Sequence, residues 1–249
     1  MLRHKGKGRT YSHNLKLASL LSAVAGMVNI CGVLALGTLT TNVTGHFAYF
    51  AETLFLRDFS AALAFVVYIL FFLFGAFVSG VLTESVTERF HLAYIMPLAV
   101  EILILGAVIV LGEAFYGTDQ FPVVALACIL LFAMGLQNAL VTRVSQSVVR
   151  TTHLTGLFTD LGIELAQRLL YRGATEQSRL RKGIFLKLMI IAGFFLGGIA
   201  GGYLYQYFRL KALLLPIGVL SFTLIYDRLI FRFYRLRRRL RPKTPKTLR

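Results

Sequence analysis

Two short polar segments with the same residue pattern interrupt the apolar sequence of this chain. The first is Thr40-Thr41-Asn42-Val43-Thr44-Gly45, and the second, 111 residues later, is Thr151-Thr152-His153-Leu154-Thr155-Gly156. A Thr or Asn in front of a helix accepts a hydrogen bond from the first turn, so each segment predicts a helix start. Helix N-termini favour anions and carboxylates. We therefore expect the two starts to face each other and to bind a small anionic or carboxylate-bearing solute.

The candidate binding residues come from both segments and from the spans in front of them. Gly26-x-x-Asn29 corresponds to Gly135-x-x-Asn138, which adds one asparagine to each half. The alternative is that the threonines only satisfy a broken backbone inside a bilayer, and that the asparagines join neighbouring helices. The full candidate set is Asn29, Thr41, Asn42, Thr44, Gly45, His46, Asn138, Thr152, His153, Thr155 and Gly156.

Two acidic residues are candidates for coupling solute movement to protons. Glu101 lies near the centre of an apolar span, where an ionisable side chain is costly and therefore a functional candidate. Asp160 follows the second helix start, where it either binds a cation, pairs with Arg150 or lies on a solvated helix face. A protonated, inactive Glu101 is the alternative. His46 and His153 would form a pH-sensitive pair if the helix starts meet.

Other chemistries find little support in the sequence. Two histidines are too few ligands for a metal, and Cys31 and Cys128 lie in apolar spans as small hydrophobic residues. The chain has no Walker A loop, no H-E-x-x-H and no G-x-S-x-G motif. We therefore expect neither an enzyme nor a cofactor.

The composition places the chain in a membrane. Hydrophobic residues make up 57% of the 249 residues, and the mean hydropathy is +0.70. The net charge is +16, but the basic clusters border apolar spans. This pattern favours contact with the lipid bilayer over nucleic acid as the reason for the charge.

The elements that would position the candidate residues are six spans and two half-helices. A 1–14 arm precedes a first repeat (15–120) and a second repeat (121–233), and 234–249 form a basic tail. Each repeat would hold three spans, so the second is inverted relative to the first. The fold class is thus an all-α polytopic membrane protein. The predicted spans are 15–36, 60–82, 92–111, 121–141, 184–207 and 210–233, and the half-helices are 47–56 and 157–170.

The distribution of positive charge predicts the orientation. With both termini in the cytoplasm, 24 of the 27 Lys and Arg residues fall on the cytoplasmic side, all except Arg57, Arg209 and Lys211. If the half-helices crossed completely there would be eight spans, and the Lys and Arg residues would be divided less unevenly between the two sides of the membrane. The six-span arrangement is therefore the preferred one.

Three motifs at this spacing resemble one known family. T-N-V-T-G at 41–45, G-L-Q-N-A at 135–139 and R-T-T-x-x-T-G at 150–156 are similar to the DUF1275/UPF0700 (YoaK-like) family of bacterial membrane proteins, over about residues 15–232. The resemblance implies a bacterial inner-membrane protein with about six spans and no established molecular function. The family commonly has Asp at the position of Asn29 and Asn at that of His46.

The first expectation for function is a secondary transporter or permease whose halves rock about the two helix starts. The alternatives are a channel-like facilitator of the same architecture and a non-transporting membrane scaffold. The sequence leaves the solute, the coupling ion and a homo-oligomer open.

Overall fold

Helices are the regular secondary structure of the described chain. A computed structural model describes residues 11–85, 92–118, 122–145 and 151–225. These ranges hold seven complete α-helices, one 3₁₀ helix and the α-helical residues 214–225, and they contain no strand. The expectation of an all-α protein is therefore confirmed.

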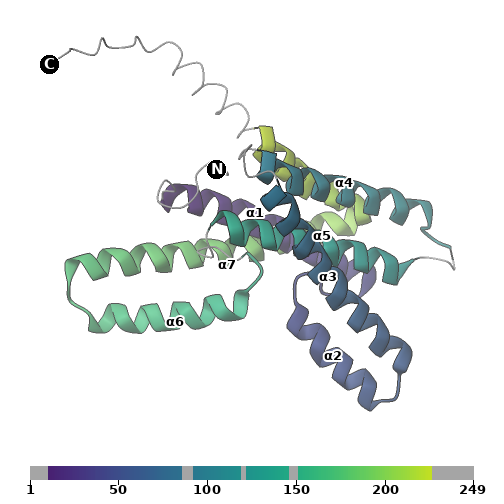
Figure 1. Cartoon of the computed structure of the whole chain (residues 1–249), viewed down its shortest axis with the longest axis horizontal. Coiled ribbons are helices and arrows are strands. Elements are labelled where there is room, and N and C mark those ends of the chain that lie inside the picture. Colours follow the sequence, from purple (N-terminus) through teal and green to yellow (C-terminus); the bar gives the residue numbers. More distant parts are fainter. Residues whose placement is uncertain (1–10, 86–91, 119–121, 146–150, 226–249) are drawn as a thin grey trace, which may run out of the picture.

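The helices fall into two sets of similar order (Figure 1). The first set begins with a long helix, continues with a short one and ends with two long ones: α1 (Tyr11–Leu36), α2 (Val43–Phe55), α3 (Phe59–Ser85) and α4 (Leu92–Ala114). The second set has the same beginning: α5 (Val123–Val144), α6 (Leu154–Leu170) and α7 (Ala174–Phe208). The 3₁₀ helix η3 (Arg209–Leu213) follows, and helical backbone continues over 214–225.

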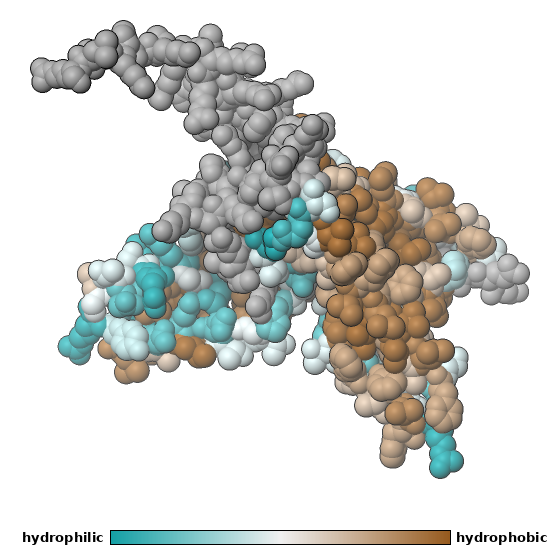
Figure 2. Space-filling model, viewed as in Figure 1, coloured by the Kyte–Doolittle hydropathy of each residue, from teal (hydrophilic) through white to brown (hydrophobic). Residues whose placement is uncertain are grey.

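Five stretches of the described chain are long and apolar enough to cross a membrane. They are Leu15–Leu36, Phe59–Ser85, Ile95–Ala114, Val123–Val144 and Ala174–Ile225, of which the last contains α7, η3 and the helical residues after it. Apolar residues cover the side of the molecule formed by α2, α3 and α4, whereas polar residues cover much of the face of the α6–α7 hairpin that is seen in this view (Figure 2). Large exposed apolar surfaces of this kind are typical of contact with lipid.

The long helices pack in two pairs through glycines. Helix α1 lies along α7, where a methyl group at Gly26 would overlap the carbonyl of Phe194. Helix α3 lies along α5, where a methyl group at Gly135 would overlap the carbonyl of Phe72 in the same way. Only glycine allows backbones to approach so closely.

Helix α5 forms the centre of the fold, since its side chains from Leu126 to Val144 are mostly buried. Across the contact between α1 and α5, Gln137 Nε2 donates a hydrogen bond of 2.8 Å to the carbonyl of Leu21. Cys31 and Cys128 are both buried and free, as the sequence predicts.

Charged side chains connect the helices at the two ends of the molecule. Arg143 at the end of α5 forms an ion pair with Glu84 at the end of α3. At the other end of these spans, Lys211 Nζ lies 2.8 Å from Glu113 Oε2, and the Arg209 guanidinium lies 3.8 Å from the centre of the Tyr116 ring. Residues 113–116 and 209–211 therefore lie at the same end, which agrees with the predicted six-span order.

Several helix boundaries differ from the prediction, most of them by a few residues. Helices α2 and α6 begin at Val43 and Leu154, so Thr44 and Thr155 lie within the first turns rather than in front of them. Helix α7 begins at Ala174, because the basic residues of 174–182 are good helix formers and add ten residues to the predicted span at 184–207. The last part of the predicted span at 210–233, residues 226–233, lies outside the described residues.

Candidate functional site

The first polar interruption is stabilised by one asparagine of α1. Asn29 Oδ1 accepts hydrogen bonds from Thr40 N at 3.0 Å, Thr41 N at 3.3 Å and Thr41 Oγ1 at 3.0 Å. Helix α1 ends just before, where Gly37 adopts a φ of 64° that side chains disfavour. Since Thr40 and Thr41 are buried, their N–H groups need this partner in an apolar environment.

Asn42 is the N-cap of α2, as the sequence predicts. Its Oδ1 accepts a hydrogen bond of 3.0 Å from Gly45 N, and the asparagine side chain lies over Gly45. A side chain at Gly45 would crowd Asn42, which explains why a glycine follows three residues after the cap.

His46 lies inside the protein and not at an open site. Its ring is 1% exposed and lies next to the rings of Phe65 and Tyr68 of α3. His46 Nε2 is 2.6 Å from the carbonyl of Leu39, and because a carbonyl only accepts, this nitrogen carries the hydrogen. His46 therefore fixes the start of α2 against both the interruption and α3.

The second interruption repeats part of this arrangement. Asn138 Oδ1 accepts a hydrogen bond of 3.1 Å from Thr152 Oγ1, at the positions equivalent to Asn29 and Thr41. His153 is the N-cap of α6, but its side chain makes no capping hydrogen bond and instead lies against Gly156. Arg150, the predicted partner of Asp160, lies outside the described residues.

The structure brings each asparagine to its own interruption but gives the two short helices separate surroundings. Helix α2 forms a hairpin with α3, and α6 forms a hairpin with α7. The two hairpins extend in different directions, and α2 and α6 each begin at the end nearer the middle of the molecule (Figure 1). Thr44 and Thr155 are exposed on the first turns. His46 is buried in the first hairpin, whereas His153 is exposed at the start of the second.

Asn29 also borders an open groove of about 450 Å³ between α1 and α7. The groove exists because glycines line both helices, and its walls are mostly apolar, with Asn29 and Gln206 as the polar side chains. It is lined by Gly26, Asn29, Ile30, Leu34, Phe194, Phe195, Gly198, Ile199, Gly202, Tyr203 and Gln206.

The predicted coupling residues have opposite environments. Glu101 is fully buried in α4, and neither of its carboxylate oxygens has a hydrogen-bond partner among the described residues. Asp160 is exposed on α6. One turn later, Glu164 lies 2.7 Å from Lys187 Nζ of α7, so this acid holds the hairpin together. No group of three or more potential metal ligands occurs in the described ranges.

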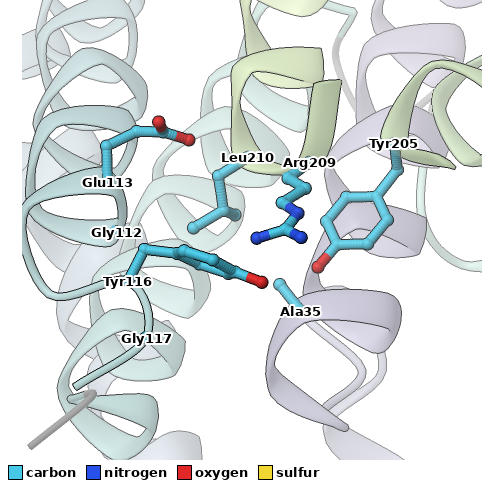
Figure 3. Close-up of a pocket in the computed structure, with 8 residues that line it drawn as sticks. All are labelled: Ala35, Gly112, Glu113, Tyr116, Gly117, Tyr205, Arg209 and Leu210. Carbon is cyan, nitrogen blue, oxygen red and sulfur yellow. The ribbon is translucent and has the colours of Figure 1, made fainter. Parts of the chain in front are cut away.

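A pocket of about 250 Å³, which the sequence does not predict, lies at the end of the molecule that contains residues 113–117 (Figure 3). Arg209, Tyr116 and Tyr205 line it together with Glu113. One sequence feature points to it, because Arg209 is one of the three basic residues that the six-span arrangement places on the outer side. Its aromatic neighbours come from other helices, however, and spacing along the chain does not reveal them.

Comparison with known proteins identifies a family. No curated protein and no solved structure matches the chain. The model of a family described as "Protein of unknown function (DUF1275)" matches residues 17–226, which is most of the 249-residue chain. The match contains both interruptions, both asparagines, Glu101 and the Arg209 pocket. The chain therefore belongs to the DUF1275 family of proteins of unknown function.

Proposed function

We propose that this protein is a secondary transporter of a small anionic or carboxylate-bearing solute, built from two inverted three-span halves. The equivalent glycine contacts support the repeat. Gly26 and Phe194 meet in one crossing as Gly135 and Phe72 meet in the other. Such a repeat places related elements of the two halves on opposite sides of the membrane.

The observation that carries the proposal is the pair of interruptions, each bound by an asparagine one helix earlier. Breaking a helix within a bilayer exposes N–H and C=O groups, and transporters use such breaks where the backbone lines a solute path. Asn29 and Asn138 accept hydrogen bonds from residues of the interruptions. Thr44 and Thr155 remain exposed on the first turns of α2 and α6. These hydroxyls and the positive ends of the helices suit an anion.

Glu101 is the proposed coupling residue. A carboxylate without partners inside an apolar bundle is stable only when it carries a proton, and it releases that proton only when water or a polar group reaches it. A side chain with these properties links a change in helix packing to proton movement. Asp160 stays the second candidate, on the exposed face of α6.

The proposed setting is the bacterial inner membrane, with six spans and both termini in the cytoplasm. Cysteine substitutions Arg57→Cys and Glu113→Cys test it, because six spans put both positions outside and eight put both in the cytoplasm. The native Cys31 and Cys128 are buried and give little background. Labelling of intact cells by a membrane-impermeant maleimide at both positions supports six spans. Labelling only after the cells are opened contradicts them.

The transport proposal is tested in two steps. Purified protein is first screened for stabilisation by carboxylates and inorganic anions. Uptake of the most stabilising compound is then measured in proteoliposomes with and without an uncoupler. The expected result is uptake that the uncoupler abolishes and that Glu101→Gln lacks. Uptake that does not depend on the proton gradient identifies a channel-like facilitator. If the full screen gives no stabilisation and no uptake, the result supports a scaffold.

A further inference from the structure

The pocket that contains Arg209 lies where the ends of three long helices meet η3. Ala35 comes from α1, Glu113 from α4 and Tyr205 from α7, while Tyr116 follows α4 and Arg209 begins η3. The volume of about 250 Å³ is enough for a small ligand or for one polar group of a larger one.

The pocket carries one positive charge that no carboxylate of the described residues neutralises. Arg209 makes no ion pair there, and its guanidinium instead lies 3.8 Å above the centre of the Tyr116 ring. Glu113 is the acidic residue in the lining, but Lys211 Nζ holds its Oε2 at 2.8 Å. The charges of Glu113 and Lys211 cancel, and the charge of Arg209 remains.

Apart from Glu113, which Lys211 holds, the polar side chains around this charge can donate hydrogen bonds. Figure 3 shows the hydroxyl ends of Tyr116 and Tyr205 pointing into the same space as the guanidinium, with Ala35 beside them. A guanidinium has five N–H donors and no acceptor, and each tyrosine adds an O–H. A concave site that combines a planar cation with hydroxyl donors matches a carboxylate or a phosphate.

Arg209 has a backbone conformation that glycine would adopt more easily. Its φ is 50° and its ψ is −133°, a region that L-residues rarely occupy. The turn between α7 and η3 thus has an arginine where glycine would relieve strain. This turn directs the guanidinium back toward α1 and α4 (Figure 3).

We infer that this pocket binds a single anionic group, a carboxylate or a phosphate, through the Arg209 guanidinium and the hydroxyls of Tyr116 and Tyr205. The group belongs either to a free solute or to the headgroup of a lipid. The site is separate from the two interruptions, and binding there requires no transport.

The test measures binding to the purified full-length protein in detergent, with sodium acetate and inorganic phosphate as probes and sodium chloride as the ionic-strength control. The readout is the unfolding temperature, followed with a dye that reacts with Cys31 and Cys128 once they are exposed. We expect at least one probe to stabilise the wild-type protein more than chloride does. Arg209→Gln should weaken this effect by about tenfold in probe concentration, and Arg209→Lys should retain part of it.

Two further variants keep the result interpretable. Arg209→Gly fits the backbone, so it should fold at least as well as the wild type and still lose the probe effect. Arg57→Gln changes the other arginine of positive φ, which lies exposed in the α2–α3 turn, and should keep the full effect. Equal stabilisation of the wild type and Arg209→Gly, or no stabilisation by either probe, would overturn the inference.

A second arm separates the two sources of the anion. The protein is placed in nanodiscs of phosphatidylcholine alone or with added phosphatidylglycerol, and acetate and phosphate are titrated again. If acetate and phosphate no longer stabilise the protein only when phosphatidylglycerol is present, the pocket binds a lipid phosphate. If their stabilising effect is the same in both kinds of nanodisc, the pocket binds a free solute. The effect of Arg209→Gly is measured on probe binding and not on uptake, so failure of the transport proposal leaves this result unaffected.

Discussion

In the first half of the chain, Asn29 accepts three hydrogen bonds from the interruption, Asn42 caps α2, and the buried His46 contacts both Leu39 and α3. In the second half, Asn138 accepts one hydrogen bond among the described residues, from Thr152. The equivalent cap, His153, makes none through its side chain. Among the described residues, more side-chain hydrogen bonds and contacts therefore hold the interruption of the first half than that of the second.

The short helices also differ in what holds them. Helix α2 packs against α3 through aromatic rings, including a stacked contact of Tyr49 with Phe65. Helix α6 is largely exposed, including several large apolar side chains, and is tied to α7 by the Glu164–Lys187 ion pair and by Gln177, which donates a hydrogen bond to the carbonyl of Arg168 at 2.8 Å. Because local stability follows buried contacts and hydrogen bonds, we expect the second interruption to open more readily than the first.

The largest effect is expected where the two halves are alike. Gly26→Val and Gly135→Val each push a side chain into a backbone carbonyl of the neighbouring helix, so each should lower the free energy of unfolding by about 3 kcal/mol. The control is Gly106→Val in α4, where a side chain meets nothing within 4 Å. Thermal unfolding followed by reaction of the buried thiols measures the changes. A marked difference between the two crossings would contradict their equivalence.

The asparagines should reveal the difference between the halves. Asn29→Ala leaves two buried N–H groups without an acceptor and should cost about 2–3 kcal/mol, whereas Asn138→Ala should cost about 1 kcal/mol. Asn29→Asp keeps an acceptor at the same place and should recover most of the loss. The same unfolding measurement applies. Equal losses for the two alanine variants would show that the halves are fixed equally well.

The caps give a smaller contrast. Asn42→Ala removes the hydrogen bond to Gly45 N and should destabilise α2 by about 1 kcal/mol, while His153→Ala should change α6 by less than about 0.5 kcal/mol. His153→Asn should add a cap and stabilise α6. Hydrogen exchange of peptides that contain Gly45 or Gly156 measures these local changes. Faster exchange at Gly156 in His153→Ala would contradict the account.

The smallest contrast lies within α6. Glu164→Gln should weaken the partly buried ion pair with Lys187 and cost about 0.5–1 kcal/mol, seen as faster exchange along the α6–α7 hairpin. Asp160→Asn, on the exposed face, should leave exchange unchanged. If Asp160→Asn loosened the hairpin as much as Glu164→Gln, the two acids would have to share one structural role.

The sequence predicted most of the helices, because runs of apolar residues between polar breaks mark membrane spans without reference to packing. It also predicted the Asn42 cap, and the Gly-x-x-Asn repeat marked Asn29 and Asn138 as candidates, but it did not show that each asparagine bonds to the interruption of its own half. The burial of His46 depends on Phe65 and Tyr68, which belong to another helix. The Arg209 pocket is likewise formed by residues of four separate segments. Contacts of this kind are set by tertiary packing, which a single sequence does not display.

The central claim is that the two interrupted helices form one solute path. It is tested most directly by uptake of the best stabilising compound into proteoliposomes containing the wild type, Thr44→Val, Thr155→Val or the double variant. Valine keeps the shape of threonine and replaces its hydroxyl with a methyl group, so folding should be unchanged at these exposed positions. We predict that each single variant lowers uptake and that the double variant abolishes it at an unchanged unfolding temperature. Uptake by the double variant at the wild-type rate would contradict the claim.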